Sequence, residues 1–144
     1  MHALTQGIRS TLRRALTQCY DHFLEHDTEM HCWEVLAELL SSDLTDNILC
    51  DVGMPILHHS VLYNCRVMIA NRRVVHVRPK MWLANDGNYR EMRWFTPWMR
   101  PHVVEDYRLP PCITDVTGQS KVTFGDALIC TNDTVLGVEL CEEL

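Results

Sequence analysis

One segment near the start of the chain has its hydrophobic residues at helical spacing. Between Thr28 and Leu40 the apolar residues fall on one helical face and the glutamates lie elsewhere; that face comprises Met30, Trp33, Leu36, Ala37 and Leu40. The spacing therefore predicts an amphipathic helix over residues 28–40. The polar stretch that follows, residues 41–47, predicts a surface connection.

The apolar runs after this helix are shorter and predict strands. Residues 48–57, 61–70 and 74–77 form three such runs, and Asn71-Arg72 separates the last two. A short polar pair between two apolar runs is typical of a β-hairpin turn. We therefore expect three consecutive strands, of which the second and third form a hairpin.

The second half of the chain is less regular. Residues 81–111 contain four prolines and many aromatic residues, which predicts a long connection, and long connections are usually functional. Residues 124–131 and 135–140 predict two last strands around a turn at Asn132-Asp133. Helical and strand patterns mixed without strict alternation predict an α/β protein with layered α+β architecture.

Composition and charge limit the function classes. The formal net charge is −6, which argues against a dedicated nucleic-acid-binding protein. No apolar run approaches the ~18 residues that would predict a membrane span. The seven cysteines are odd in number and stand mostly in apolar runs, so we expect reduced and mostly buried thiols.

The first eighteen residues differ from the rest. They contain Arg9, Arg13 and Arg14, several hydroxyl side chains and no acid. Such a composition is typical of a mitochondrial transit peptide, and it also suits an ordinary surface helix. We treat residues 1–18 as a divergent N-terminal segment.

Two residues at predicted strand ends suit nucleophilic chemistry. Cys141 follows a predicted strand, and a turn into a helix at that point would direct successive N–H groups at a developing oxyanion. Lys80 ends the predicted hairpin, where a cation beside a thiol favours the thiolate and stabilises an oxyanion. Taken singly, a cysteine such as Cys141 is usually a small buried residue, and a lysine such as Lys80 is usually a solvated cation.

Other clusters allow weaker interpretations. The loop at residues 85–98 places Trp94, Phe95 and Trp98 among arginines, which suits either aromatic residues pinned to the core or a platform that stacks RNA bases. Cys19, His22, His26 and Cys32 fit no common zinc spacing, so we expect no metal site. We expect the pair His58-His59 to be solvated beside a turn.

Several stretches together carry a family resemblance. They are Tyr63-Asn64-Cys65-Arg66-Val67 through Arg78-Pro79-Lys80, residues 85–98, and Phe124-Gly125-Asp126-Ala127 through Leu140-Cys141-Glu142-Glu143-Leu144. Upstream, Cys19-Tyr20-Asp21-His22 and residues 48–55 continue the same pattern. The whole resembles the glutaminase (amidase) domain of eukaryotic-type glutamine-dependent NAD synthetases, in the nitrilase or carbon–nitrogen hydrolase superfamily. It covers residues 19–144.

The resemblance implies a triad of glutamate, lysine and cysteine. Cys141 matches the nucleophile and Lys80 the catalytic lysine, while Glu91 resembles an additional, supporting glutamate near the pocket. The backbone N–H of Glu142, together with Lys80, would stabilise the oxyanion. The family's general-base glutamate belongs to a Pro-Glu-Leu-like element before residue 19, and residues 1–18 contain no glutamate.

The resemblance also implies a fold and a biological role. The fold is a partial nitrilase-like α-β-β-α sandwich over residues 19–144, without the synthetase domain. The activity is glutamine hydrolysis that supplies ammonia for amidation of nicotinic acid adenine dinucleotide. No cofactor is expected in this part, because ATP is used by the synthetase domain. The expected partners are glutamine, that domain and further copies of the enzyme, in the cytoplasm or, as a minor alternative, in mitochondria.

Two interpretations of the chain itself stay open. It is either the glutaminase part of such an enzyme or a shortened, non-catalytic product that at most binds partners. Because the general base has no counterpart and the chain stops beside a predicted strand edge, we expect the 144-residue chain alone to fold poorly and to hydrolyse glutamine at no useful rate.

Overall fold

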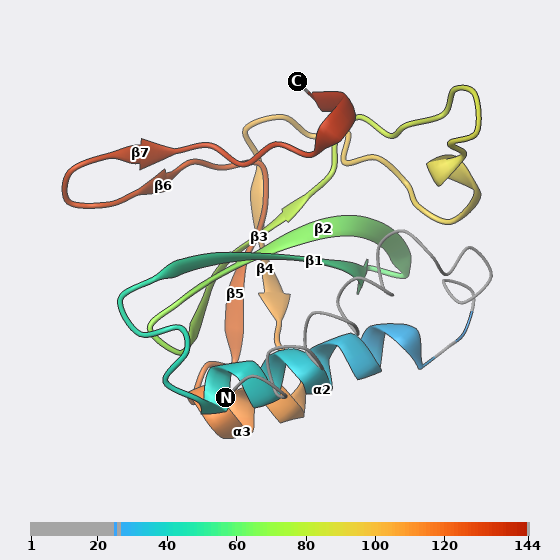
Figure 1. Cartoon of the computed structure of the whole chain (residues 1–144). Coiled ribbons are helices and arrows are strands. Elements are labelled where there is room, and N and C mark those ends of the chain that lie inside the picture. Colours follow the sequence, from blue (N-terminus) through green and yellow to red (C-terminus); the bar gives the residue numbers. More distant parts are fainter. Residues whose placement is uncertain (1–24, 26, 144) are drawn as a thin grey trace.

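A computed structural model describes residue 25 and residues 27–143 (Figure 1). The helices and strands are, in chain order, α2 (Thr28–Ser41), β1 (Leu49–His58), β2 (Val61–Ala70), β3 (Arg73–Pro79), η2 (Glu91–Arg93), β4 (Val104–Arg108), α3 (Pro111–Thr117), β5 (Lys121–Gly125), β6 (Ile129–Cys130), β7 (Val135–Leu136) and η3 (Cys141–Glu143). Two of these elements, η2 and η3, are single 3₁₀ turns.

Five strands form the main sheet, in the order β1-β2-β3-β5-β4. The pairs β1–β2 and β2–β3 are antiparallel, β3 runs parallel to β5, and β4 pairs antiparallel with β5. The strands β6 and β7 form a separate two-stranded hairpin. Because β3 and β5 are parallel, the end of β3 at Pro79 and the end of β5 at Gly125 lie at the same end of the sheet.

Two tight turns set the register of the first three strands. The turn residues His59 and Ser60 have φ of 50° and 64°, and Asn71 and Arg72 have φ of 48° and 61°. Two consecutive residues with positive φ make a type I′ turn, whose twist matches that of the strands it joins. The predicted turn at Asn71-Arg72 is therefore confirmed, and with it the hairpin of residues 61–79.

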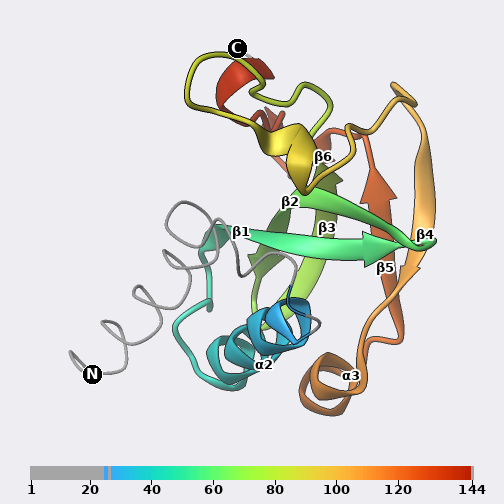
Figure 2. The same ribbon diagram turned by 90° about the vertical axis from the view of Figure 1, so that its right-hand side faces the viewer.

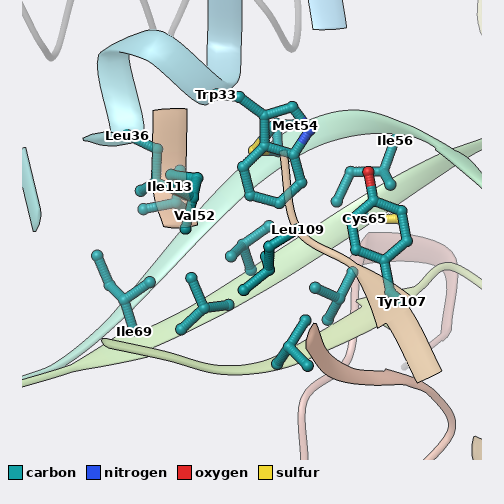
Figure 3. Close-up of a cluster of buried hydrophobic side chains, with 14 of the residues drawn as sticks. Trp33, Leu36, Val52, Met54, Ile56, Cys65, Ile69, Tyr107, Leu109 and Ile113 are labelled. Carbon is teal, nitrogen blue, oxygen red and sulfur yellow. The ribbon is translucent and has the colours of Figure 1, made fainter. Parts of the chain in front are cut away.

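Within the described residues, the hydrophobic core lies between the sheet and the helices α2 and α3, which cover one face of it (Figures 1 and 2). Trp33 and Leu36 from α2 and Ile113 from α3 are almost completely buried against sheet residues such as Met54 and Ile69 (Figure 3). Burying apolar surface stabilises a fold by about 25 cal/mol for each Å². This layer therefore holds the helices on the sheet.

One carboxylate reinforces the attachment of α2. Glu29 Oε1 accepts hydrogen bonds from the backbone N–H of Leu57 at 2.9 Å, from Trp33 Nε1 at 3.3 Å and from the Tyr107 hydroxyl at 3.3 Å. Leu57 belongs to β1 and Tyr107 to β4, so Glu29 ties the start of the helix to both edge strands of the sheet.

The second half of the chain departs from the predicted strands. The strand predicted over residues 124–131 is wrong, because β5 begins at Lys121 and ends at Gly125, and β6 covers only Ile129–Cys130. Gly125 has φ of 139°, and a Cβ there would lie 2.2 Å from the Val103 carbonyl oxygen, so the chain turns sharply where only glycine fits. The strand predicted over residues 135–140 shortens to Val135–Leu136.

The long connection predicted over residues 81–111 also contains structure. Within it lie the 3₁₀ turn η2 and the edge strand β4. The sequence of β4, Val104-Glu105-Asp106-Tyr107-Arg108, lacks the alternation of apolar and polar residues that predicts a half-buried strand. Its one buried residue is Tyr107. The helix α3 was not predicted either, although it starts at Pro111 and ends before Gly118, whose φ is 70°.

The predicted fold class is confirmed as mixed α/β. The described residues supply one helical layer and one main sheet of the expected α-β-β-α sandwich.

The expectation of mostly buried cysteines is wrong for the six described. Cys32 and Cys65 are buried, Cys50 and Cys112 are intermediate, and Cys130 and Cys141 are exposed; all six are free thiols. No helix in the described part is long and apolar enough to span a bilayer.

Candidate active site

The predicted site residues gather at the end of the molecule farthest from α2 and α3. Both views show η3, which contains Cys141, and η2, which contains Glu91, beyond the same end of the sheet (Figures 1 and 2). Lys80 directly follows Pro79, the last residue of β3, which pairs with Cys65 of β2, so the sheet fixes where Lys80 begins. The fold thus brings together segments that are distant in sequence.

Lys80 is buried and forms a short ion pair. Its side chain is only 3% exposed, and its Nζ lies 2.7 Å from Glu91 Oε2. The Lys80 N–H donates to the Asn64 carbonyl at 2.8 Å, and the Lys80 carbonyl accepts from the Trp98 N–H at 2.9 Å. The alternative of a solvated surface lysine is therefore wrong.

Glu91 is held by donors on both of its oxygens. Its Oε2 accepts from Lys80 Nζ and from the Ala84 N–H at 2.5 Å, and its Oε1 accepts from Asn64 Nδ2 at 2.8 Å. A carboxylate whose two oxygens are both occupied by donors holds its cation in a fixed orientation. The arrangement suits the supporting role expected for Glu91.

Asn64 is a site residue that sequence reasoning missed. It lies in β2 and is buried, and its Oδ1 is a buried acceptor without a partner among the described residues. The available signal was a polar amide within the otherwise largely apolar run of residues 61–70. Buried polar groups are normally paired, so such a position marks a site.

Cys141 is exposed and stands on a strained backbone. Its φ is 52°, in the left-handed region that non-glycine residues rarely adopt. The turn is closed by the Glu143 N–H donating to the Leu140 carbonyl at 3.2 Å. Glu142 is the next residue of this turn, so its N–H stands one residue beyond the thiol. Strain of this kind costs about 1–3 kcal/mol and clusters at functional sites.

A cavity of about 360 Å³ opens beside these groups. Its lining is mainly apolar and comprises Arg78, Met81, Trp82, Trp98, Met99, Pro101, Glu139 and Glu143. Neither Lys80 nor Cys141 lines it, although Met81 adjoins Lys80 in the chain. The cavity is therefore next to the predicted chemistry and does not enclose it.

The aromatic loop is part of the core and not an RNA platform. Trp98 is 2% exposed and Phe95 is 7% exposed, so neither ring is free to stack on a base. Trp98 Nε1 donates to the Arg100 carbonyl at 2.7 Å, and the Arg100 guanidinium lies 4.3 Å from the centre of the Trp98 ring. The interpretation of aromatic residues pinned to the core is the one that holds.

The expectation that the histidine pair is solvated is wrong for His58. Its ring is buried, and its Nε2 lies 2.9 Å from Glu105 Oε2, while His59 is exposed. This hydrogen bond, followed by the contact with Arg100 at 2.6 Å, lowers the pKa of Glu105. The His58–His59–Glu105 group is compact enough for a cation, but Arg100 already balances the carboxylate.

The cysteine–histidine group considered as a zinc site from the sequence cannot be described in full. Of its four residues, Cys19, His22 and His26 lie outside the described residues.

Comparisons with known proteins agree on one family. Residues 7–144 match the Carbon-nitrogen hydrolase family. Over 126 residues, 88% of this chain, the sequence is 56% identical to the glutamine-dependent NAD(+) synthetases of Saccharomyces cerevisiae and of Homo sapiens. The chain spans 18% of the length of each of these relatives.

Solved structures support the same assignment. A glutamine-dependent NAD(+) synthetase from Cytophaga hutchinsonii superposes with a TM-score of 0.77 at 26% identity, covering 99% of this chain and 24% of that one. An enzyme with the same description from Acinetobacter baumannii gives a TM-score of 0.56 at 17% identity over 72% of this chain and 23% of that one, which shows the fold alone. The resemblance seen in the sequence motifs is confirmed.

Proposed function

Because the chain belongs to the carbon–nitrogen hydrolase family, we propose that it is the glutamine-hydrolysing part of a glutamine-dependent NAD synthetase. The observation that carries the proposal is the buried ion pair between Lys80 and Glu91 at the end of the molecule that also holds Cys141. Burying a cation is costly unless it is paired, and a buried ion pair is weak evidence for stability, so a functional role explains it better. The similarity to relatives described as glutamine-dependent indicates the substrate.

In the proposed reaction the Cys141 thiolate attacks the amide carbon of glutamine. The C–S bond forms while the carbonyl π electrons move to oxygen, and the resulting oxyanion is stabilised by Lys80 and by the N–H of Glu142. Collapse of this intermediate breaks the C–N bond, and ammonia leaves with the proton taken from the thiol. Water then cleaves the thioester, which yields glutamate and restores the thiol.

Glu91 supports this chemistry by orienting Lys80. Its two oxygens are occupied by Lys80, Asn64 and the Ala84 N–H, so the ammonium group of Lys80 is held in one place. A fixed cation costs no reorganisation when the oxyanion forms, which is why preorganised donors accelerate reactions. The proton-accepting glutamate of the family would be supplied by another part of the enzyme.

The same proposal extends to the role of the whole enzyme. The ammonia would be used to amidate nicotinic acid adenine dinucleotide at an ATP-dependent synthetase domain, in a homo-oligomeric cytoplasmic enzyme. The support is the similarity to relatives whose descriptions name NAD synthesis.

A chimera tests the proposal. The matched 126-residue segment of the yeast relative is replaced by the corresponding stretch of this chain, and NAD synthesis is measured with glutamine or with ammonia as nitrogen source. We expect the chimera to use both. In the Cys141→Ala variant we expect glutamine-dependent synthesis to disappear and ammonia-dependent synthesis to survive, because only the first needs the thiol.

Two results would contradict the proposal. One is continued use of glutamine by the Cys141→Ala chimera. The other is a Cys141-containing chimera that uses ammonia normally and never glutamine, which would favour the non-catalytic alternative. A matched Cys130→Ala chimera serves as control, because Cys130 is also an exposed cysteine of this chain but lies in the β6–β7 hairpin.

A further inference from the structure

A buried carboxylate joins the two segments that carry the proposed catalytic residues. The side chain of Glu143 is 6% exposed. Its Oε1 accepts from the Met81 N–H at 2.5 Å, and its Oε2 accepts from the Leu140 N–H at 2.8 Å. Met81 follows Lys80 and Leu140 precedes Cys141, so one side chain spans from the lysine segment to the cysteine segment.

Arg78 supplies the counter-charge for this carboxylate. Its side chain is 7% exposed, its Nη1 lies 3.5 Å from Glu143 Oε1, and its Nε lies 3.4 Å from Asp126 Oδ1. The same Nη1 donates to the Pro79 carbonyl, and Asp126 accepts from the His102 N–H at 2.8 Å. A buried carboxylate without such a partner would be strongly unfavourable.

The hydrogen bonds of Glu143 also close the strained turn. The Glu143 N–H donates to the Leu140 carbonyl, and the Glu143 Oε2 accepts from the Leu140 N–H. Cys141, with φ of 52°, lies between these two residues in the chain. A residue with positive φ relaxes when the contacts around it are removed, because extended conformations are lower in energy. Relaxation of Cys141 would move its thiol relative to Lys80.

We infer that Glu143 is a positioning residue that fixes Cys141 relative to Lys80 through its two backbone hydrogen bonds, with Arg78 as its counter-charge. The inference rests on the proposed function for the roles of the cysteine and the lysine. The charged side chains of the two segments that meet here are Arg78 and Lys80 on one side and Glu139, Glu142 and Glu143 on the other.

Alkylation of individual cysteines tests this inference without any need for glutamine turnover. The chimera described above is treated with iodoacetamide near neutral pH, and the rate at each cysteine of the stretch taken from this chain is followed by peptide mass spectrometry. Cys130, which is exposed and remote from this turn, gives the reference rate. Cys65, which is fully buried in β2, reports whether the sheet stays folded.

In the unaltered chimera we expect Cys141 to react faster than Cys130 near neutral pH, because the turn holds its exposed thiol in the electropositive surroundings of Lys80. In Glu143→Gln we expect the rate at Cys141 to fall about tenfold, toward that of Cys130. Cys65 should stay protected. Asp115→Asn, which removes an equal charge from the exposed surface of α3, should leave the rate at Cys141 unchanged.

A second variant keeps the test decisive. Glu143→Asp retains the charge but is one methylene shorter, so it cannot reach both N–H groups and should produce an intermediate loss. Equal alkylation rates of Cys141 and Cys130 in the unaltered chimera would overturn the inference, as would an unchanged Cys141 rate in Glu143→Gln. Exposure of Cys65 in both variants would show that Glu143 supports the fold as a whole and would also overturn it. Failure of the chimera with glutamine would instead count against the proposed function.

Discussion

The two ends of this molecule bury their side chains in different ways. The end covered by α2 and α3 is an apolar core in which Trp33, Leu36 and Ile113 pack on the sheet. The opposite end buries charge instead, since the side chains of Lys80 and Glu143 are 3% and 6% exposed.

The physical cost of burial differs between these ends. Burying apolar groups is favourable in itself, whereas burying charged groups requires a partner for each. The polar end meets this requirement with the pairs Lys80–Glu91 and Arg78–Glu143, yet an apolar replacement of such pairs is often at least as stable. Charge at this end is therefore better explained by function than by stability, and the predictions below test that distinction.

Among variants that keep Cys141, replacement of Lys80 is expected to have the largest effect on activity. In the chimera, Lys80→Met should lower glutamine-dependent turnover by about 10²–10³-fold, comparable to loss of an oxyanion donor, while ammonia-dependent synthesis persists. The matched control is Lys121→Met, because Lys121 is an exposed lysine whose partner Asp106 is also exposed. Near-normal turnover in a folded Lys80→Met chimera would assign Lys80 to structure.

The apolar end should respond in stability and not in chemistry. Leu36→Ala should lower the free energy of opening of α2 and β1 by about 2–5 kcal/mol, because Leu36 is 1% exposed and leaves a cavity. Native-state hydrogen exchange of the chimera measures this quantity. Glu38→Ala on the exposed face of the same helix is the control, and an equal loss in both variants would contradict the described packing.

The rate of cysteine alkylation should distinguish the buried thiol of Cys32, at the apolar end, from the exposed thiol of Cys130. Burial, followed by the nearby charge of Glu29, raises the pKa of Cys32 from 9.0 to about 11. This rise means about 100-fold less thiolate than an ordinary cysteine forms at any pH below 9, so in the chimera buried Cys32 should be alkylated far more slowly than exposed Cys130. The difference should narrow only as pH rises toward 11.

The same measurement decides whether the isolated chain folds. Poor folding, as expected from the sequence, would make Cys32 as reactive as Cys130. Protection of Cys32 would show that the core between α2 and the sheet forms in the 144-residue chain. Rates determined by peptide mass spectrometry at pH 8 are sufficient for this comparison.

The smallest effect on stability is expected for the solvent-exposed ion pair between Lys121 and Asp106. Lys121 and Asp106 lie 2.7 Å apart across β5 and β4, and both side chains are 65% exposed. Exposed pairs contribute about 0.2–1 kcal/mol, since solvent screens them. Lys121→Met should therefore change the opening free energy of β5 by no more than this, and a loss as large as that of Leu36→Ala would refute the ranking.

Local pattern was informative where neighbouring residues decide the structure. The helix near residues 28–40 and the hairpin around Asn71-Arg72 follow from periodicity and turn chemistry over a few residues. Prediction failed at β4, where a single buried residue gives no alternation, and at Gly125, where contact with Val103 ends the strand. In both places the structure depends on contacts between residues that the pattern of apolar and polar positions along the chain does not reveal.

The sequence by itself determined the family, through motifs that include Lys80 and Cys141, and it determined the mixed α/β class. Only the tertiary structure decided that Lys80 is buried against Glu91 and that Glu143 reaches the N–H of Met81, 62 residues earlier. The reason is that periodicity records the solvent exposure of neighbouring residues. The pairing of charges depends instead on where β3 and η3 end in space, which the parallel pairing of β3 with β5 and the turn at Gly125 establish.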